Sequence, residues 1–370
     1  MIYLDHAATT PPDGRVIEAM AQCMCESWQN PSAAYAAAGI ARRALRQARQ
    51  AMAALLNADA SQVLFTSGGT EANNQAMLPA RGGHAVISAI EHASVLNAAR
   101  AICGEVTLVP PDGAGQISPE AVSRALRPET RLISVQLANN ETGVLQSVAG
   151  IGALARERRI PYHCDAVQAF GHVPVDVRAM NIDLLSLSGH KLYGPRGAGA
   201  LYVRQGVLLP PLLRGGGQEL GLRAGTENLP AIVGLGVAAE LARKDMEAEA
   251  AREQALLAAF AANLRSRIPA CRILGEGAPH LPGLMAALLP GLPSERAIAE
   301  LDLMGIQLSG GAACASREHE VSHVYTAMGL SRLDAACVLR ISIGRSTDAQ
   351  ALNTAAEAIE KVYKSVVPLL

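Results

Sequence analysis

The feature that most constrains this chain is an alternation of short apolar runs with longer amphipathic runs. The short runs are rich in β-branched residues and predict strands; they are QVLFTS, HAVISA, EVTLVP, TRLISVQLA, IPYHCDA, LLSLSG and GALYV. The longer runs predict helices; they are IARRALRQARQAMAALL, SVLNAARAIC, SPEAVSRAL and VAGIGALARERR. Such an alternation predicts an α/β fold with a mostly parallel sheet and helices on both faces.

The alternation ends near Pro230, where a long helix over residues 231–268 is expected. Shorter elements follow, among them the strand VLRISIG and a closing amphipathic helix. We therefore predict a large domain over residues 13–250 and a smaller α/β domain made of residues 1–12 and 251–370.

Composition narrows the class of protein. The 370 residues carry a net charge of −1, so neither nucleic acid nor an anionic membrane surface is a favoured partner. No apolar run reaches the roughly 20 residues of a membrane span, and no secretory signal is visible at the N-terminus. We expect a cytoplasmic protein, in which the scattered cysteines are free thiols.

The stretch FTSGGTEANN places a glycine turn between a predicted strand and a predicted helix. The N–H groups of Gly68, Gly69 and Thr70 would then lie at a helix N-terminus, which is an anion seat. An ordinary capped turn explains the same pattern equally well. The spacing matches neither a dinucleotide fingerprint nor a P-loop.

Asp165, in YHCDAVQAFG, stands at the end of a predicted strand, where ligands bind in open α/β sheets. Its carboxylate could hold a protonated ring nitrogen, and Gln168 could reach the same ring. The alternative is an aspartate that caps a helix.

Lys191, in LSLSGHKLYGPRG, is one of only four lysines in the chain, which otherwise uses arginine. A guanidinium cannot form an imine, whereas a lysine in a partly dry site can lose its proton and condense with an aldehyde. Lys191 is therefore a candidate Schiff-base residue, and Ser188 and His190 beside it could donate to a phosphate. The alternative is a surface lysine.

Cys314 lies among small residues in LSGGAACASREHEVSHV, a segment without a strong helix or strand pattern. Exposed cysteines in such segments are the reactive kind, although a buried small residue fits as well. HEVSH, from His319 to His323, matches the H-E-x-x-H zinc pattern. The extended pattern fails, because Thr326 stands where glycine is required, and we predict no metal site.

With these motifs in order, the chain resembles the cysteine desulfurases of the class V aminotransferase family, which have the fold-type I scaffold. The matching segments span nearly the whole chain; they are YLDHAATTP, NPS, FTSGGTEANN, EHASV, ANNETG, HCDAVQAFG, LSLSGHKLYGPRG, LRGGGQE, RAGTEN, GAACAS and LRISIGR.

The resemblance implies pyridoxal 5′-phosphate as cofactor and a role for each matching residue. Lys191 would hold the cofactor as an imine, Asp165 would pair with the ring nitrogen, and His92 would stack on the ring and help to move protons. The remaining residues implied to contact the cofactor are Gly69 and Thr70 (phosphate), Asn140 and Gln168 (ring hydroxyl), and Ser188 and His190 (phosphate).

The resemblance also implies the substrate contacts and the partners. Arg340 would clamp the carboxylate of L-cysteine, with Asn30 nearby, and Cys314 would take the sulfur as a persulfide. Thr226 would reach the phosphate of a second subunit, which implies a homodimer. The length of the Cys314 segment resembles the long-loop group, which hands sulfur directly to an acceptor protein such as an iron–sulfur scaffold or a thiolation factor.

Four positions depart from the family pattern: Ala33, Tyr35, Leu220 and Leu222. They lie in segments that are near the active-site entrance in the family, so substrate and partner preference stay open. The rival interpretations are a related lyase that acts on selenocysteine and a non-catalytic scaffold that binds a sulfur acceptor.

Overall fold

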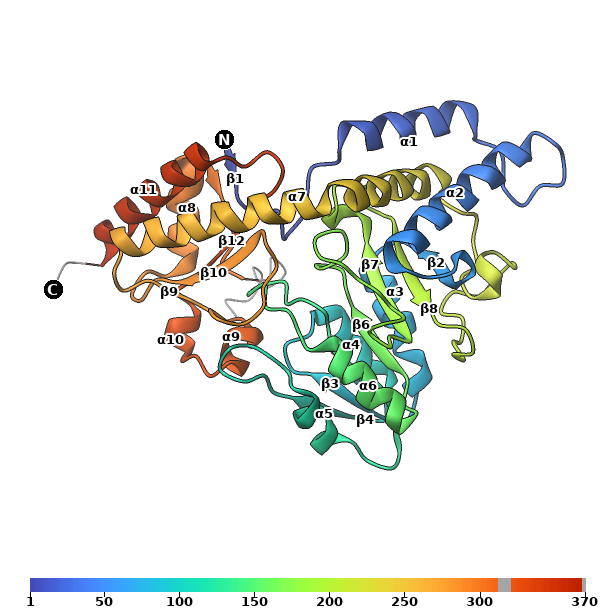
Figure 1. Cartoon of the computed structure of the whole chain (residues 1–370), viewed down its shortest axis with the longest axis horizontal. Coiled ribbons are helices and arrows are strands. Elements are labelled where there is room, and N and C mark those ends of the chain that lie inside the picture. The colour runs from blue at the N-terminus through green and yellow to red at the C-terminus, as the bar shows by residue number, and fades with distance from the viewer. Residues whose placement is uncertain (312–320, 368–370) are drawn as a thin grey trace.

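The computed structural model describes residues 1–311 and 321–367, which fold into two lobes joined by one long helix (Figure 1). Among these residues a seven-stranded sheet has the order β2-β8-β7-β6-β5-β3-β4. Its strands are β2 (Val63–Thr66), β3 (His84–Ser88), β4 (Glu105–Val109), β5 (Thr130–Ser134), β6 (Tyr162–Asp165), β7 (Leu184–Ser188) and β8 (Gly199–Val203). All seven predicted strands are present.

The sheet is mostly parallel, as predicted, with one exception among the described strands. β8 is antiparallel to both of its neighbours, β7 and β2. Only residues 189–198 separate β7 from β8, and so short a connection cannot carry the crossover that parallel pairing requires.

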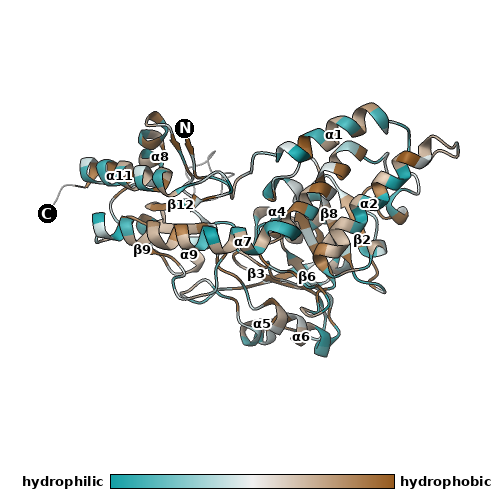
Figure 2. Ribbon diagram, turned by 45° about the horizontal axis from the view of Figure 1, so that its top comes forward, coloured by the Kyte–Doolittle hydropathy of each residue, from teal (hydrophilic) through white to brown (hydrophobic). Residues whose placement is uncertain are grey.

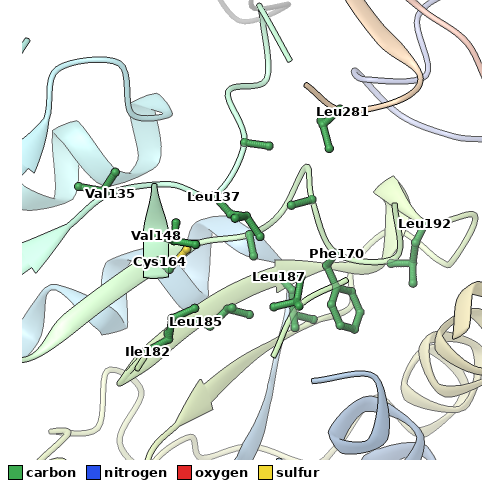
Figure 3. Close-up of a cluster of buried hydrophobic side chains, with 14 of the residues drawn as sticks. Val135, Leu137, Val148, Cys164, Phe170, Ile182, Leu185, Leu187, Leu192 and Leu281 are labelled. Carbon is green, nitrogen blue, oxygen red and sulfur yellow. The ribbon is translucent and has the colours of Figure 1, made fainter. Parts of the chain in front are cut away.

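Helices cover both faces of this sheet because its strands are apolar on both sides. Along β3 and β7, Val86 and Leu185 point to one core, while Ile87 and Leu184 point to the other. The first core also holds α2, α5, α6 and part of α7, and Figure 3 shows some of its buried side chains. The second core holds α3 and α4. The helices are α2 (Ala38–Leu56), α3 (Gly69–Ala76), α4 (Ala93–Ile102), α5 (Pro119–Ala125), α6 (Val148–Arg158) and α7 (Leu229–Arg267).

The smaller lobe combines the end of the chain with its beginning. An antiparallel sheet has the order β12-β10-β9, and β1 pairs with β11 in parallel. The strands are β1 (Ile2–Tyr3), β9 (Arg272–Ile273), β10 (Leu284–Leu288), β11 (Ile306–Gln307) and β12 (Val338–Ser342). The helices are α8 (Ser294–Leu303), α9 (His323–Ala327), α10 (Arg332–Ala335) and α11 (Ala349–Val366). A further helix, α1 (Gly14–Glu26), connects β1 with α2 along the chain.

α7 has 39 residues and joins the two lobes. Leu235 and Ala239 lie in the core of the large lobe, whereas Phe260 and Leu264 lie in the core of the small one. The predicted boundary between residues 250 and 251 falls inside this helix, and the division into two domains stays a prediction. Polar and apolar residues alternate along α7 (Figure 2). No helix in the described part of the chain is long and apolar enough to cross a membrane.

Candidate active site

A cavity of ≈280 Å³ opens at the carboxyl ends of β5, β6 and β7, the edge where ligands bind in parallel sheets. Ten of the residues predicted for the site line this cavity. They are Gly69, Thr70, His92, Asn140, Asp165, Gln168, Ser188, His190, Lys191 and Arg340. The cavity thus gathers residues from segments that are far apart in the sequence.

Three predicted residues are not among those lining the cavity. Asn30 is exposed between α1 and α2, and its Oδ1 accepts a hydrogen bond from the Ser32 N–H at 2.8 Å. Thr226 is exposed as well. Cys314 lies outside the described residues. The roles expected for these three side chains stay predictions.

Lys191 ends a single 3-10 turn, Gly189–Lys191, that follows β7. Its Nζ donates to the carbonyl oxygen of Ala8 at 2.8 Å and to that of Ala7. Gln168 Nε2 donates to the same Ala7 oxygen at 2.7 Å. The segment after β1 therefore positions both the lysine and the glutamine through backbone atoms.

Asp165 ends β6 and is 6% exposed. Its Oδ1 accepts from the Val167 N–H at 2.9 Å, and its Oδ2 accepts from Asn73 Nδ2 at 2.7 Å. Two donors thus fix a buried carboxylate against the cavity. A carboxylate held in this way can keep a heteroaromatic ring nitrogen protonated beside it.

Hydrogen bonds connect Asp165 to His92 through two residues that the sequence analysis missed. The Asn73 amide nitrogen that donates to Asp165 also donates to Ser94 Oγ at 2.9 Å. Ser94 Oγ lies 2.7 Å from His92 Nδ1, and the Ser94 backbone N–H donates to that nitrogen at 3.1 Å. A backbone N–H can only donate, so Nδ1 is an acceptor and the proton of the neutral ring sits on Nε2.

The environment of His92 also favours its neutral form. Burial is the main cause that lowers the pKa of His92, and the neighbouring Lys191 and His323 lower it further, while Asp165 opposes them. The pKa of His190 falls to about 4, again mainly through burial and then through Lys191 and Arg196. Both imidazoles are therefore uncharged at neutral pH.

The turn between β2 and α3 forms the predicted anion seat. Gly68 precedes α3 at a φ of +155°, and no described side chain caps the helix, so its first N–H groups have no side-chain acceptor there. Gly69 and Thr70, at this helix start, line the cavity. A Cβ at Gly69 would stand 2.6 Å from Val167 Cγ2. Glycine is thus required at position 69 for close approach, and this corner suits a phosphate.

Arg340 brings a fixed positive charge from β12 of the small lobe and is only 2% exposed. Its Nη2 donates to Asp5 Oδ1 at 2.7 Å and its Nη1 to the carbonyl oxygen of Asn140 at 3.0 Å. Its Nε is buried and has no hydrogen-bond partner among the described residues. These contacts leave donors for a carboxylate that enters the cavity.

Val321 and Ser322 lie outside any helix, so the described part of HEVSH lacks the regular helix that zinc binding through H-E-x-x-H requires. α9 begins only at His323, with Ser322 as its cap, and His323 Nε2 lies 3.0 Å from the carbonyl oxygen of Glu91. Within the described ranges, no three histidine, cysteine or acidic side chains are grouped to hold a metal ion.

Comparison with known proteins gives one family model and several relatives that cover nearly the whole chain. The family model described as Aminotransferase class-V matches residues 2–354. Cysteine desulfurase IscS of Methanosarcina thermophila is 40% identical, over 99% of this chain and 92% of that protein. Among solved structures, a NifS-like protein of Rickettsia africae ESF-5 is 31% identical, with a TM-score of 0.92 over 98% of this chain and 99% of that one. The structure described as SspA in complex with cysteine is 37% identical, with a TM-score of 0.80 over 93% of this chain and 99% of that one.

The chain therefore belongs to the class-V aminotransferase family, whose fold is that of fold-type I pyridoxal 5′-phosphate enzymes. Within this family it is a cysteine desulfurase, and the predicted fold class, cofactor and family are confirmed. The residues present also fit the cofactor. The lysine can bind an aldehyde, the fixed carboxylate suits a pyridine nitrogen, and the glycine corner suits a phosphate.

Proposed function

We propose that this chain removes sulfur from L-cysteine, releases L-alanine and carries the sulfur as a persulfide on Cys314 to an acceptor protein. The observation that supports this most is the single cavity that joins Lys191, Asp165, His92 and Arg340 at the carboxyl edge of the sheet. The proposal also includes three further points: Cys314 carries the sulfur, an acceptor protein receives it, and the chain forms a homodimer.

When bound, pyridoxal 5′-phosphate supplies an electron sink that weakens bonds at the substrate's Cα and Cβ. Lys191 would hold the cofactor and, once displaced by the substrate amine, move a proton on the substrate. Asp165 would keep the ring nitrogen protonated. Gly69, Thr70, Ser188 and His190 would hold the phosphate.

Arg340 would orient the substrate by binding its carboxylate, since its guanidinium is already fixed by Asp5 and Asn140. Neutral His92 would present its Nε2–H to the reacting groups as a hydrogen-bond donor. Cys314 would attack the substrate sulfur as a thiolate. A sulfur–sulfur bond would form, the carbon–sulfur bond would break, and its electron pair, with protons, would complete alanine.

The subunit arrangement we propose is a homodimer in which Thr226 reaches the phosphate of the partner subunit. Arg223 Nε donates to Glu71 Oε1 at 2.9 Å, which ties the segment before Thr226 to the helix of the phosphate corner. Trp28 is 73% exposed and Leu220 is 73% exposed, so large apolar side chains are available for an interface. Sedimentation should give a dimer, and a monomer that retains the cofactor fully would contradict the arrangement.

We also place the protein in the cytoplasm, acting on acceptors of iron–sulfur assembly or thiolation. The six cysteines that the structure describes are free thiols, as a reducing compartment requires. Sulfur transfer from labelled cysteine to candidate acceptors would identify the partner.

Mass spectrometry after incubation with cysteine tests the proposed role of Cys314. Cys314→Ala should bind the cofactor normally but accumulate no persulfide and release little alanine. Cys25→Ala is the matched control, because Cys25 is an exposed free thiol. An extra sulfur on another cysteine, with Cys314 unmodified, would refute the proposal.

A further inference from the structure

A second and larger hollow, of ≈840 Å³, lies at the edge of the main sheet opposite the candidate active site. Thr130, the first residue of β5, and Pro161, just before β6, line it. β6 then runs from this hollow to Asp165, which is in the active-site cavity. A ligand in the hollow would therefore be separated from the active site by the length of the strands.

Five arginines are among the described residues that line this hollow, and we call it the arginine hollow. They belong to Arg131, Arg156, Arg159, Arg178 and Arg204. Among the described residues of the lining, Asp183 is the only one with a carboxylate side chain. The whole chain has a net charge of −1, so the positive charge here is local.

Only two of these arginines have carboxylate partners among the described residues. Arg204 pairs with Asp183, and Arg178 Nη2 lies 3.0 Å from Asp59 Oδ1. The other three have no ion pair in the described part of the chain. Arg131 donates to the Arg81 carbonyl oxygen at 3.2 Å and Arg156 to the amide oxygen of Asn181, which leaves both charges uncompensated.

Helix electrostatics account for part of this cluster only. Arg156 lies in the last turn of α6, and Arg159 follows as its cap, where the helix dipole favours cations. Arg131 instead comes from β5, Arg178 from the loop before β7, and Arg204 directly follows β8. Like charges gathered from separate elements around one hollow repel one another, and an anion bound there would offset that repulsion.

We propose that the arginine hollow binds a ligand that carries two or more phosphate groups. The planar guanidinium matches phosphate oxygens with two hydrogen bonds, so three unpaired arginines suit a polyphosphate better than a single anion. The volume is in the range of small-ligand pockets. Val207 and Leu208 add an apolar wall, and Leu208 is 89% exposed, so a nucleoside polyphosphate and an inorganic polyphosphate both fit.

Calorimetric titration of the protein loaded with pyridoxal 5′-phosphate, in phosphate-free buffer, tests this proposal. The loaded form is used because the cofactor's own phosphate then fills the corner at Thr70. Tripolyphosphate and ATP are the two probes, each at low and at raised salt. Binding should weaken at raised salt. Tighter binding of ATP assigns a nucleoside polyphosphate, and equal binding assigns an inorganic one.

Arg156→Ala and Arg159→Ala should each weaken binding about tenfold, the effect of losing a charged hydrogen bond. Arg158→Ala is the matched control: Arg158 is in the same helix end, pairs with Glu157 at 3.6 Å and does not line the hollow. The proposal is overturned if neither probe binds, if Arg159→Ala binds as tightly as the unchanged protein, or if Arg158→Ala weakens binding equally. A polyglutamate peptide that binds where both phosphate probes fail would overturn it too.

Discussion

Gly69→Ala tests whether close packing at the phosphate corner sets the geometry of the site. The new Cβ would stand 2.6 Å from Val167 Cγ2, well inside ordinary van der Waals contact. Val167 is β-branched and has little rotamer freedom with which to yield. Its N–H also donates to Asp165 Oδ1 at 2.9 Å, so displacement of Val167 would disturb the carboxylate that lines the cavity.

Two opposing effects determine how much Gly69→Ala changes the free energy of unfolding. Overpacking of this kind costs about 1–3 kcal/mol. Gly69 begins α3, and replacement of a helical glycine by alanine stabilises the folded chain by about 0.4–1 kcal/mol. The steric cost is larger, so the free energy of unfolding should fall by about 1–2 kcal/mol, and cofactor affinity should fall with it.

Urea unfolding of the cofactor-free protein measures the first effect, and cofactor titration measures the second. Val167→Ala removes Cγ2, so in that background Gly69→Ala should become neutral or stabilising. Gly14→Ala is the control, because no atom of the described residues lies within 4 Å of its added Cβ. An equal loss from Gly69→Ala in both backgrounds would refute the steric argument.

Three further outcomes follow from the structure. The ¹⁵N spectrum of the cofactor-free protein should show His92 neutral at pH 7 with its proton on Nε2; a protonated Nδ1 would contradict the Ser94 contact. Burial raises the pKa of Glu253 to about 7 from 4.5, so the folded state binds more protons than the unfolded state between those values, and stability should fall as pH rises through that window. The fall should amount to about 3 kcal/mol, and Glu253→Gln should remove it in urea unfolding at a series of pH values. Arg340→Lys should raise KM for cysteine about tenfold or more, with a smaller change in kcat, in alanine-release assays; an unchanged KM would exclude a carboxylate clamp.

The strands and helices of the large lobe could be predicted because each has a local sequence pattern: a short apolar run for a strand and a longer amphipathic run for a helix. The apolar run of β8 does not show its antiparallel direction, because such a run has the same pattern in either direction. The direction follows from residues 189–198 between β7 and β8, a connection too short for a parallel crossover. In the small lobe β1 pairs with β11, some 300 residues away, and no local pattern reports such a contact.

Site residues could be predicted where the side chain has distinctive chemistry. They were missed where backbone atoms or uncharged side chains position those residues through hydrogen bonds. Lys191 and Asp165 belong to the first kind. The carbonyl oxygens of Ala7 and Ala8 carry no sequence signal at all. Asn73 had a usable signal, since it lies three residues after Thr70 and therefore on the same side of α3.

The continuity of α7 has a consequence for how the protein unfolds. One rod of about 58 Å is part of both hydrophobic cores, so neither lobe can lose its structure without exposing part of the helix that supports the other. Amide hydrogens at both ends of α7 should then exchange together, through a shared global opening. Arg340, paired with Asp5, reaches the cavity from one lobe and Lys191 reaches it from the other. The geometry of the cavity is thereby tied to a single cooperative unit, and partial melting of either lobe would disrupt the cavity.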